Sequence, residues 1–200
     1  MICRNEQLLY RGKGQQIKQS FRLYMNGETA QSLKEKGLCY KICWGVSLQH
    51  LQKMAAEYGK DRELAEALWT SAVRECKLLA ILTYPPEEFT EQTADRWLAD
   101  ADNQELAELL VFYILQHVPY SKALALRLLQ SGNRLHLLCA FNLLGRLFSN
   151  HVVLDDHSKS QYQEKAEEIL VGDDFSLKHA VINSLVKFAD TCSDSCQPSV

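Results

Sequence analysis

Proline and glycine are scarce in this chain of 200 residues, which contains only four prolines and nine glycines. An all-β protein needs many tight turns, so this scarcity argues against one. Charged residues interrupt every apolar run well before it reaches the length of a membrane-spanning helix, and no apolar segment of a secretory signal follows Met1. We therefore expect a soluble, cytoplasmic protein without a membrane partner.

The motifs of several enzyme classes are also missing. The six histidines lack the His-x-x-x-His and His-Glu-x-x-His spacings of metallohydrolases, and no glycine-rich phosphate-binding loop occurs. The seven cysteines are an odd number, which favours reduced thiols over a disulfide framework. Cys39 with Cys43 and Cys192 with Cys196 are spaced more widely than the usual ligand pairs of structural zinc sites. We expect no metal and no cofactor.

The formal net charge of −3 provides no general attraction to nucleic acid, but the charges are unevenly distributed. Residues 1–41 carry eight basic side chains against three acidic ones, and residues 121–150 carry four basic side chains and no acidic one. Residues 86–110 carry eight acidic side chains and a single arginine. The two basic regions could form a DNA-binding surface, whereas the acidic segment favours binding to a protein.

Apolar residues recur at helical spacing along almost the whole chain, which predicts an all-α protein. Capping residues, glycines and prolines predict helices over 5–22, 28–36, 47–58, 61–83, 87–99, 103–117, 121–131, 134–149, 158–171 and 174–191. A break is expected in the fourth helix near Thr70-Ser71. The expected N-caps are Ser47, Asp61, Asp102, Ser121, Asn133, and either Asp173 or Asp174.

Three features of the pattern predict buried positions. The helix at 134–149 is apolar on nearly every side, so we expect it to lie between neighbouring helices. Trp69 and Trp97 fall in apolar stripes and are predicted to belong to the core. Cys76 has basic neighbours that could lower its pKa, but packing is the favoured role.

From residue 47 the helices pair, and second helices begin near 61, 103, 134 and 174, the spacing typical of two-helix repeats.

One stretch of the chain resembles a known family. The residues that carry the resemblance, in the order found in that family, are Tyr40, Trp44-Gly45-Val46 and Arg74-Glu75. They resemble the AlkD-like DNA alkylation repair family, and the similarity continues more weakly to about residue 190. The resemblance implies an all-α fold, an α-α superhelix of HEAT-like repeats that forms a curved solenoid with a concave face. It implies a single domain over residues 1–192, followed by a polar tail at 193–200.

The same resemblance implies a reaction. The family releases cationic alkylated purines with a carboxylate and aromatic faces, both of which stabilise positive charge. Its Asn-Trp-Asp-x-x-Asp pattern aligns with the segment that starts at Asn103, where Gln104 replaces the aromatic residue and Glu108 replaces the catalytic aspartate. A DNA-clamping arginine aligns with Leu138 and a cleft-lining tryptophan with Asn183. We therefore predict that the family reaction is lost and that Glu108 is the remaining catalytic candidate.

Three functions stay open from the sequence. The favoured one is a non-catalytic module for double-stranded DNA, damaged or branched, whose affinity depends on salt and not on base sequence. The second is an N-glycosylase that releases N3- or N7-alkylpurines through Glu108, and the third is a solenoid that binds a protein partner and no DNA. The predicted DNA contacts are Tyr24, Lys41, Arg74, Lys77, Gln104, Arg134, Arg146, Lys178, Asn183 and Lys187.

Overall fold

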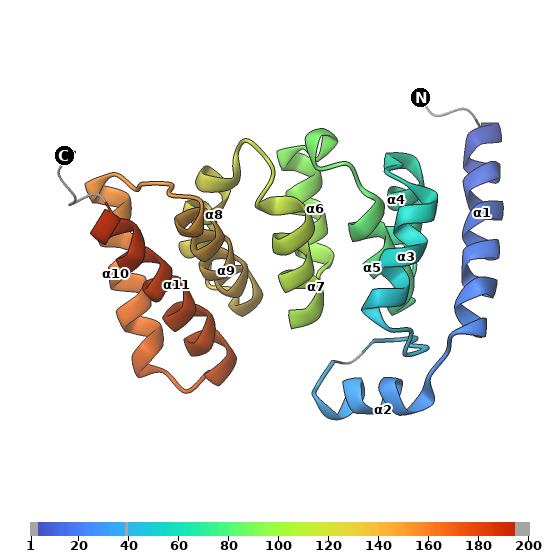
Figure 1. Cartoon of the computed structure of the whole chain (residues 1–200), viewed down its shortest axis with the longest axis horizontal. Helices are drawn as coiled ribbons and strands as arrows, with labels where there is room; N and C mark the ends of the chain where they lie inside the picture. Colours follow the sequence, from blue (N-terminus) through green and yellow to red (C-terminus); the bar gives the residue numbers. More distant parts are fainter. Residues whose placement is uncertain (1–3, 39, 195–200) are drawn as a thin grey trace. The chain divides into compact units, whose positions relative to one another are not determined.

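The computed structural model describes residues 4–38 and 40–194, and it describes no β-strand among them (Figure 1). An isolated bridge joins Ile42 and Val73. The α-helices are α1 (Arg4–Leu23), α2 (Gly27–Glu35), α3 (Leu48–Tyr58), α4 (Arg62–Trp69), α5 (Arg74–Thr83), α6 (Glu91–Asp100), α7 (Gln104–Leu110), α8 (Ser121–Leu129), α9 (Arg134–Ser149), α10 (Asp156–Val171) and α11 (Phe175–Asp194). A short 3₁₀ turn, η1 (Pro86–Glu88), precedes α6, and a π-helical segment, η2 (Val111–Leu115), follows α7. The predicted all-α class is confirmed.

Most helix ends follow the predicted capping residues. The side chains of Ser47, Asp61 and Asn133 accept backbone N–H groups in the first turns of α3, α4 and α9. Asp174 does the same for α11, where its Oδ1 accepts the N–H of Leu177 at 2.9 Å. The predicted break near Thr70-Ser71 is confirmed, because α4 and α5 are separate helices.

Four predicted boundaries are corrected by the structure. Asn103, and not Asp102, caps α7: it is extended and its Oδ1 accepts the N–H of Leu106, while its amide donates to the Asp102 carboxylate. Ser121 is the first residue of α8, so Tyr120 holds the cap position without a side-chain bond. The helix expected over 103–117 changes to π-helical geometry at 111. The helix expected to end at 191 continues to Asp194, so the predicted tail at 193–200 begins with helical residues; positions 195–200 lie outside the described residues.

Contacts divide the chain into two compact units, here called the first unit (Met1–Thr90) and the second unit (Glu91–Val200). In the first unit, α5 packs against α3 and α4, and Trp69 is buried. In the second unit, α9 packs against α7, α8 and α11, as its apolar composition predicted, and Trp97 is buried as well. The single domain over 1–192 stays a prediction. Across the described residues we find no helix with the length and apolar character needed to span a bilayer.

Candidate functional site

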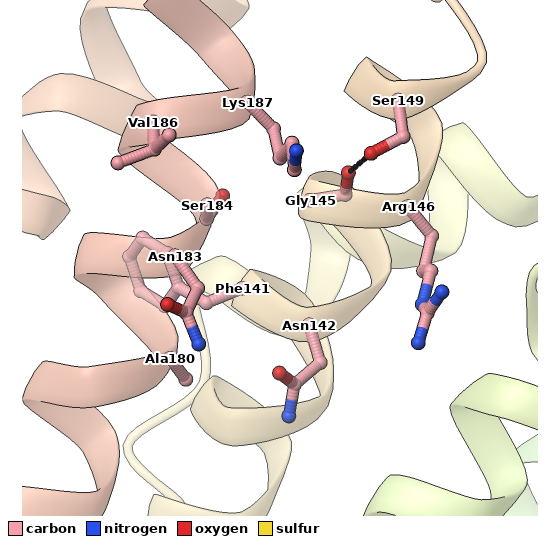
Figure 2. Close-up of a pocket in the computed structure, with 10 residues that line it drawn as sticks. All are labelled: Phe141, Asn142, Gly145, Arg146, Ser149, Ala180, Asn183, Ser184, Val186 and Lys187. Carbon is pink, nitrogen blue, oxygen red and sulfur yellow. Dashed lines mark hydrogen bonds between the residues drawn. The ribbon is translucent and has the colours of Figure 1, made fainter.

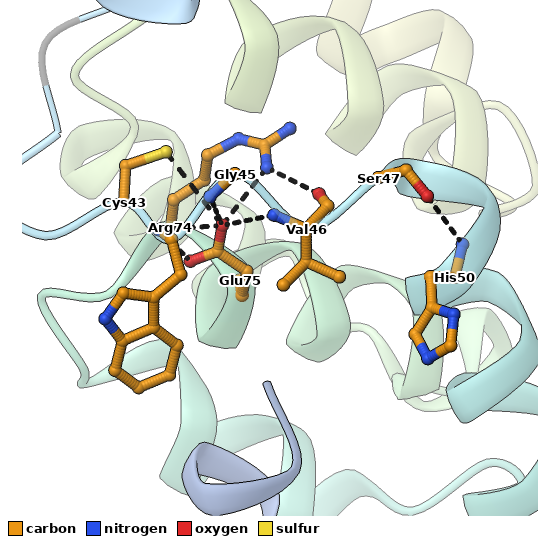
Figure 3. Close-up of polar contacts among 8 residues, drawn as sticks. Cys43, Gly45, Val46, Ser47, His50, Arg74 and Glu75 are labelled. Carbon is orange, nitrogen blue, oxygen red and sulfur yellow. Dashed lines mark hydrogen bonds and ion pairs between the residues drawn. The ribbon is translucent and has the colours of Figure 1, made fainter. Parts of the chain in front are cut away.

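The residues that carry the family resemblance in the first unit form a buried polar cluster (Figure 3). Glu75 is fully buried at the start of α5, and its carboxylate accepts the backbone N–H groups of Trp44, Gly45 and Val46 at 3.0–3.3 Å. Arg74 donates to the carbonyl oxygen of Val46 at 3.0 Å and lies 3.3 Å from Glu75. A buried carboxylate requires such donors, because burial without them is costly. The cluster therefore fixes the loop before α3 onto α5.

This cluster corrects the prediction that Arg74 contacts DNA. The Arg74 side chain is only 4% exposed, and its guanidinium bonds inside the unit, so it is unavailable to a phosphate. The other predicted contacts of the first unit are accessible to different degrees. Lys41 is exposed, Lys77 is half-buried with its ammonium 4.3 Å from the centre of the Trp69 ring, and Tyr24 is 49% exposed and stacks on His50.

In the second unit, α7 and the segment that follows it present a polar and aromatic stripe. Gln104 donates from Nε2 to the exposed Glu108 carboxylate at 2.8 Å, so both side chains lie on one face of α7. Phe112 follows four residues later in η2 and is 42% exposed. The guanidinium carbon of Arg146, on α9, lies 4.7 Å from the centre of the Phe112 ring. The sequence analysis missed Phe112, which stands in the apolar run 109–115.

A groove of about 480 Å³ runs between α9 and α11 in the second unit (Figure 2). Its lining residues are Phe141, Asn142, Gly145, Arg146, Ser149, Ala180, Asn183, Ser184, Val186 and Lys187. Three predicted DNA contacts, Arg146, Asn183 and Lys187, therefore come together here, and Asn142 joins them as a residue that the sequence analysis missed. The lining holds two cations and two amides but no acid; the nearest acid to Lys187 is Asp190 at 3.9 Å, an exposed pair of little strength.

The groove has a closely packed floor because α9 carries a glycine where it meets α11. A Cβ atom built on Gly145 would lie 3.4 Å from the Cα of Ser184, so the two backbones are already near contact distance. Ser184 is buried, and its hydroxyl is 2.9 Å from that of Tyr162 on α10. Tyr162 in turn packs against Phe141 and Phe148. The polar lining of the groove thus rests on the aromatic core of the second unit.

The remaining predicted contacts of the second unit differ in their availability. Arg134 forms a two-point ion pair with Asp174, in which Nη2 and Oδ1 are 3.1 Å apart, so its charge is matched within the protein. Lys178 is half-buried on α11. Leu138, which the resemblance aligns with the clamping arginine, is only 1% exposed and belongs to the core. Asn142 and Arg146 occupy the accessible side of α9 instead.

The Arg134–Asp174 pair predicts a pH-dependent contribution to stability. The pairing holds the pKa of the Asp174 carboxyl below its usual 3.8, so the stabilisation is present at neutral pH and is lost as the pH falls below about 4. Both side chains are a third or more exposed, so we expect only about 0.5–1 kcal/mol from the ion pair. Asp174→Asn should lose this contribution but keep the cap of α11, whereas Asp174→Ala should lose both, at about 1 kcal/mol more. Urea unfolding at neutral and acidic pH measures both values; equal stabilities of the two variants would contradict the capping role.

The buried thiols have a structural character. Burial raises the pKa of Cys76, in contrast to the lowering that its basic neighbours suggested, which agrees with the favoured packing role. Burial also raises the pKa of Cys139 to about 12, and its thiol points to the carbonyl oxygen of Ala107. Within the part of the chain that the structure describes, no group of His, Cys, Asp and Glu side chains is arranged to hold a metal ion. Cys39 and Cys196 lie outside the described residues.

The successive packed helices define a helical protein, and two cationic side chains line the groove between α9 and α11 in its second unit. The family described as DNA alkylation repair enzyme matches residues 17–144, and the chain belongs to this family. Among solved structures, the chain is similar to one described as "A new family of proteins related to the HEAT-like repeat DNA glycosylases with affinity for branched DNA structures". The TM-score is 0.78 at 18% identity, over 90% of this chain and 77% of that one, which confirms the HEAT-like fold. No curated protein sequence matches.

Proposed function

We propose that this chain is a non-catalytic DNA-binding scaffold that contacts the DNA backbone through the groove between α9 and α11. The observation that carries the proposal is the lining of the groove, which includes Arg146, Lys187, Asn142 and Asn183 and no acidic residue. Cations neutralise phosphates, and amide side chains donate hydrogen bonds to phosphate oxygens. The net charge of −3 does not by itself favour a polyanion. The support for DNA as the partner therefore comes from family membership.

Branched DNA is the form that we expect to bind most tightly. The structurally similar protein is described as having affinity for branched DNA structures, and the two chains share their fold. Gln104 supports the non-catalytic part of the proposal, because it lacks the aromatic face that the family places beside a cationic base. The proposed contacts of the groove are with phosphates and not with base edges, so they carry no sequence specificity. Any preference for one form of DNA has to come from the shape of that DNA.

The test measures binding of the full chain to a four-way junction and to a duplex of the same sequence by fluorescence polarisation. The proposal predicts tighter binding to the junction, independent of base sequence and weakened steeply between about 50 and 200 mM salt. Equal affinity for both DNA forms would remove the preference for branches and leave DNA binding intact. No retention of either DNA at the lowest salt would overturn the proposal and favour the protein-interaction scaffold.

A second candidate function, release of alkylated bases, is favoured by the geometry of Glu108. This carboxylate is exposed, and the Gln104 amide orients it on the helix face that the resemblance assigns to catalysis. If it is catalytic, single-turnover release of N3-methyladenine from methylated duplex should exceed the spontaneous rate, and Glu108→Gln should reduce that release to background.

The matched control for Glu108→Gln is Glu105→Gln, which makes the same chemical change one turn closer to the start of α7. Both variants should unfold at the same temperature as the original chain. Release that survives Glu108→Gln, or that falls equally in both variants, would exclude Glu108 as the catalytic group.

A further inference from the structure

Phe112 is an aromatic side chain with an unusual setting. It is 42% exposed although Val111 and Ile114 of the same π-helical segment are buried. The segment, η2, follows directly after α7. The Phe112 and Tyr113 rings meet edge to face, with their centres 4.8 Å apart. The Phe112 ring thus contacts Tyr113 of its own segment and still keeps part of its surface exposed.

Arg146 connects this ring to the groove. Its guanidinium carbon lies 4.7 Å from the centre of the Phe112 ring, within the range of a cation–π contact. The same side chain belongs to the lining of the groove, and Figure 2 shows it on the side of α9 away from Lys187. A phosphate bound at Arg146 would thus place its nucleotide beside Phe112.

We propose that Phe112 is a stacking platform for an unpaired base of branched DNA, with Arg146 holding the adjoining phosphate. The proposal rests on the proposed DNA binding and specifies which part of the substrate is recognised. Branched DNA offers bases that lack a pairing partner, and a base of any identity can stack on an aromatic ring. The guanidinium plane of arginine stacks on bases as well as on aromatic rings. When a base binds, the Arg146 guanidinium can therefore exchange its contact with the Phe112 ring for a contact with that base. In a fully paired duplex no base is available, and Phe112 contributes nothing.

The test uses two DNA probes that carry 2-aminopurine, a base whose fluorescence is quenched by stacking. In the first probe it is the first unpaired base of a single-stranded flap, and in the second it lies inside a paired duplex of the same sequence. Binding of the original chain should change the flap signal and leave the duplex signal unchanged. Phe112→Leu should abolish the change and weaken flap binding about tenfold, while duplex affinity is retained. Phe112→Trp, which keeps an aromatic ring at this position, should retain both the change in the flap signal and the tight binding of the flap.

Leucine keeps an apolar side chain at an exposed position, so this variant should fold, and its far-UV circular dichroism serves as the control. The stacking role is overturned if both probes are bound but the flap signal is unchanged, or if Phe112→Leu weakens both probes equally. Retention of neither probe by the original chain overturns the proposed DNA binding itself, and the stacking role with it.

Discussion

Replacement of Gly45 by alanine is expected to prevent the first unit from folding. Gly45 has a φ of +72°, and a Cβ atom there would lie 2.1 Å from the carbonyl oxygen of Asn26 and 2.7 Å from the backbone nitrogen of Ala30. Both atoms belong to the backbone at the start of α2, so no side-chain rotation relieves the clash. Gly45 also donates to the buried Glu75 carboxylate, so a displaced loop would deprive that charge of its backbone donors.

We expect Gly45→Ala to lower the free energy of unfolding by more than about 4 kcal/mol, a large fraction of the stability of a small domain. Guanidinium unfolding followed by far-UV circular dichroism measures it. The matched control is Gly37→Ala, since Gly37 has a similar φ of +81° but no atom within 4 Å of its Cβ position. That change should cost only the backbone strain, about 1–2 kcal/mol. Equal losses for both variants would show that the contact with α2 is absent in solution.

Reversal of the two groove cations is expected to abolish DNA binding. In the double variant Arg146→Glu with Lys187→Glu, the groove between α9 and α11 would carry two carboxylates where phosphates are proposed to bind. Both side chains are exposed, so the fold should survive the change. We expect affinity for a four-way junction to fall about 100-fold or more at low salt. The dependence of log affinity on log salt should become shallower by about two, because two phosphate contacts are removed.

The control for the groove is the variant Lys159→Glu with Lys165→Glu, which changes the net charge of the chain by the same amount. Both lysines lie on α10, none of whose residues lines the groove. This variant should lose a few-fold in affinity through its altered net charge and keep its salt dependence. If the two double variants lose affinity equally, general charge governs binding and the groove is not the contact surface. Arg134 is a poorer target, because reversal there would also break its pair with Asp174.

The helices of this chain could be predicted because their signals are local. Apolar spacing and the capping residues Ser47, Asp61 and Asn133 act within one turn, so neighbouring residues contain all the information. The cap of α7, where Asp102 was predicted and Asn103 is found, shows the limit of such signals. Both side chains can accept the N–H groups of a first turn. The N-cap is the residue that adopts an extended backbone when α7 packs, and this residue is Asn103. Local signals also give no indication of the π-helical turn after α7.

The candidate site was only partly predictable. Arg146 and Lys187 were predicted as basic residues of second helices, and Asn183 as the position of the family's cleft-lining tryptophan. Their convergence on one groove required the packing of α9 against α11. Phe112 was overlooked because it stands in an apolar run, where a sequence pattern cannot distinguish an exposed ring from a buried one.

By itself, the sequence determined the all-α class, the position of most helix ends and the burial of α9, because these depend on spacing and on residues within a turn. The tertiary structure decided which charges are available to a partner. Arg74, Arg134 and Arg146 look alike in the sequence, yet the first is buried beside Glu75, the second is paired with Asp174, and the third lies exposed between Phe112 and the groove. The partners of Arg134 and Arg146 lie more than thirty residues away, and Arg74 is enclosed by a loop almost as distant. A charge is matched or free according to contacts between helices, and these contacts exist only once the chain has folded.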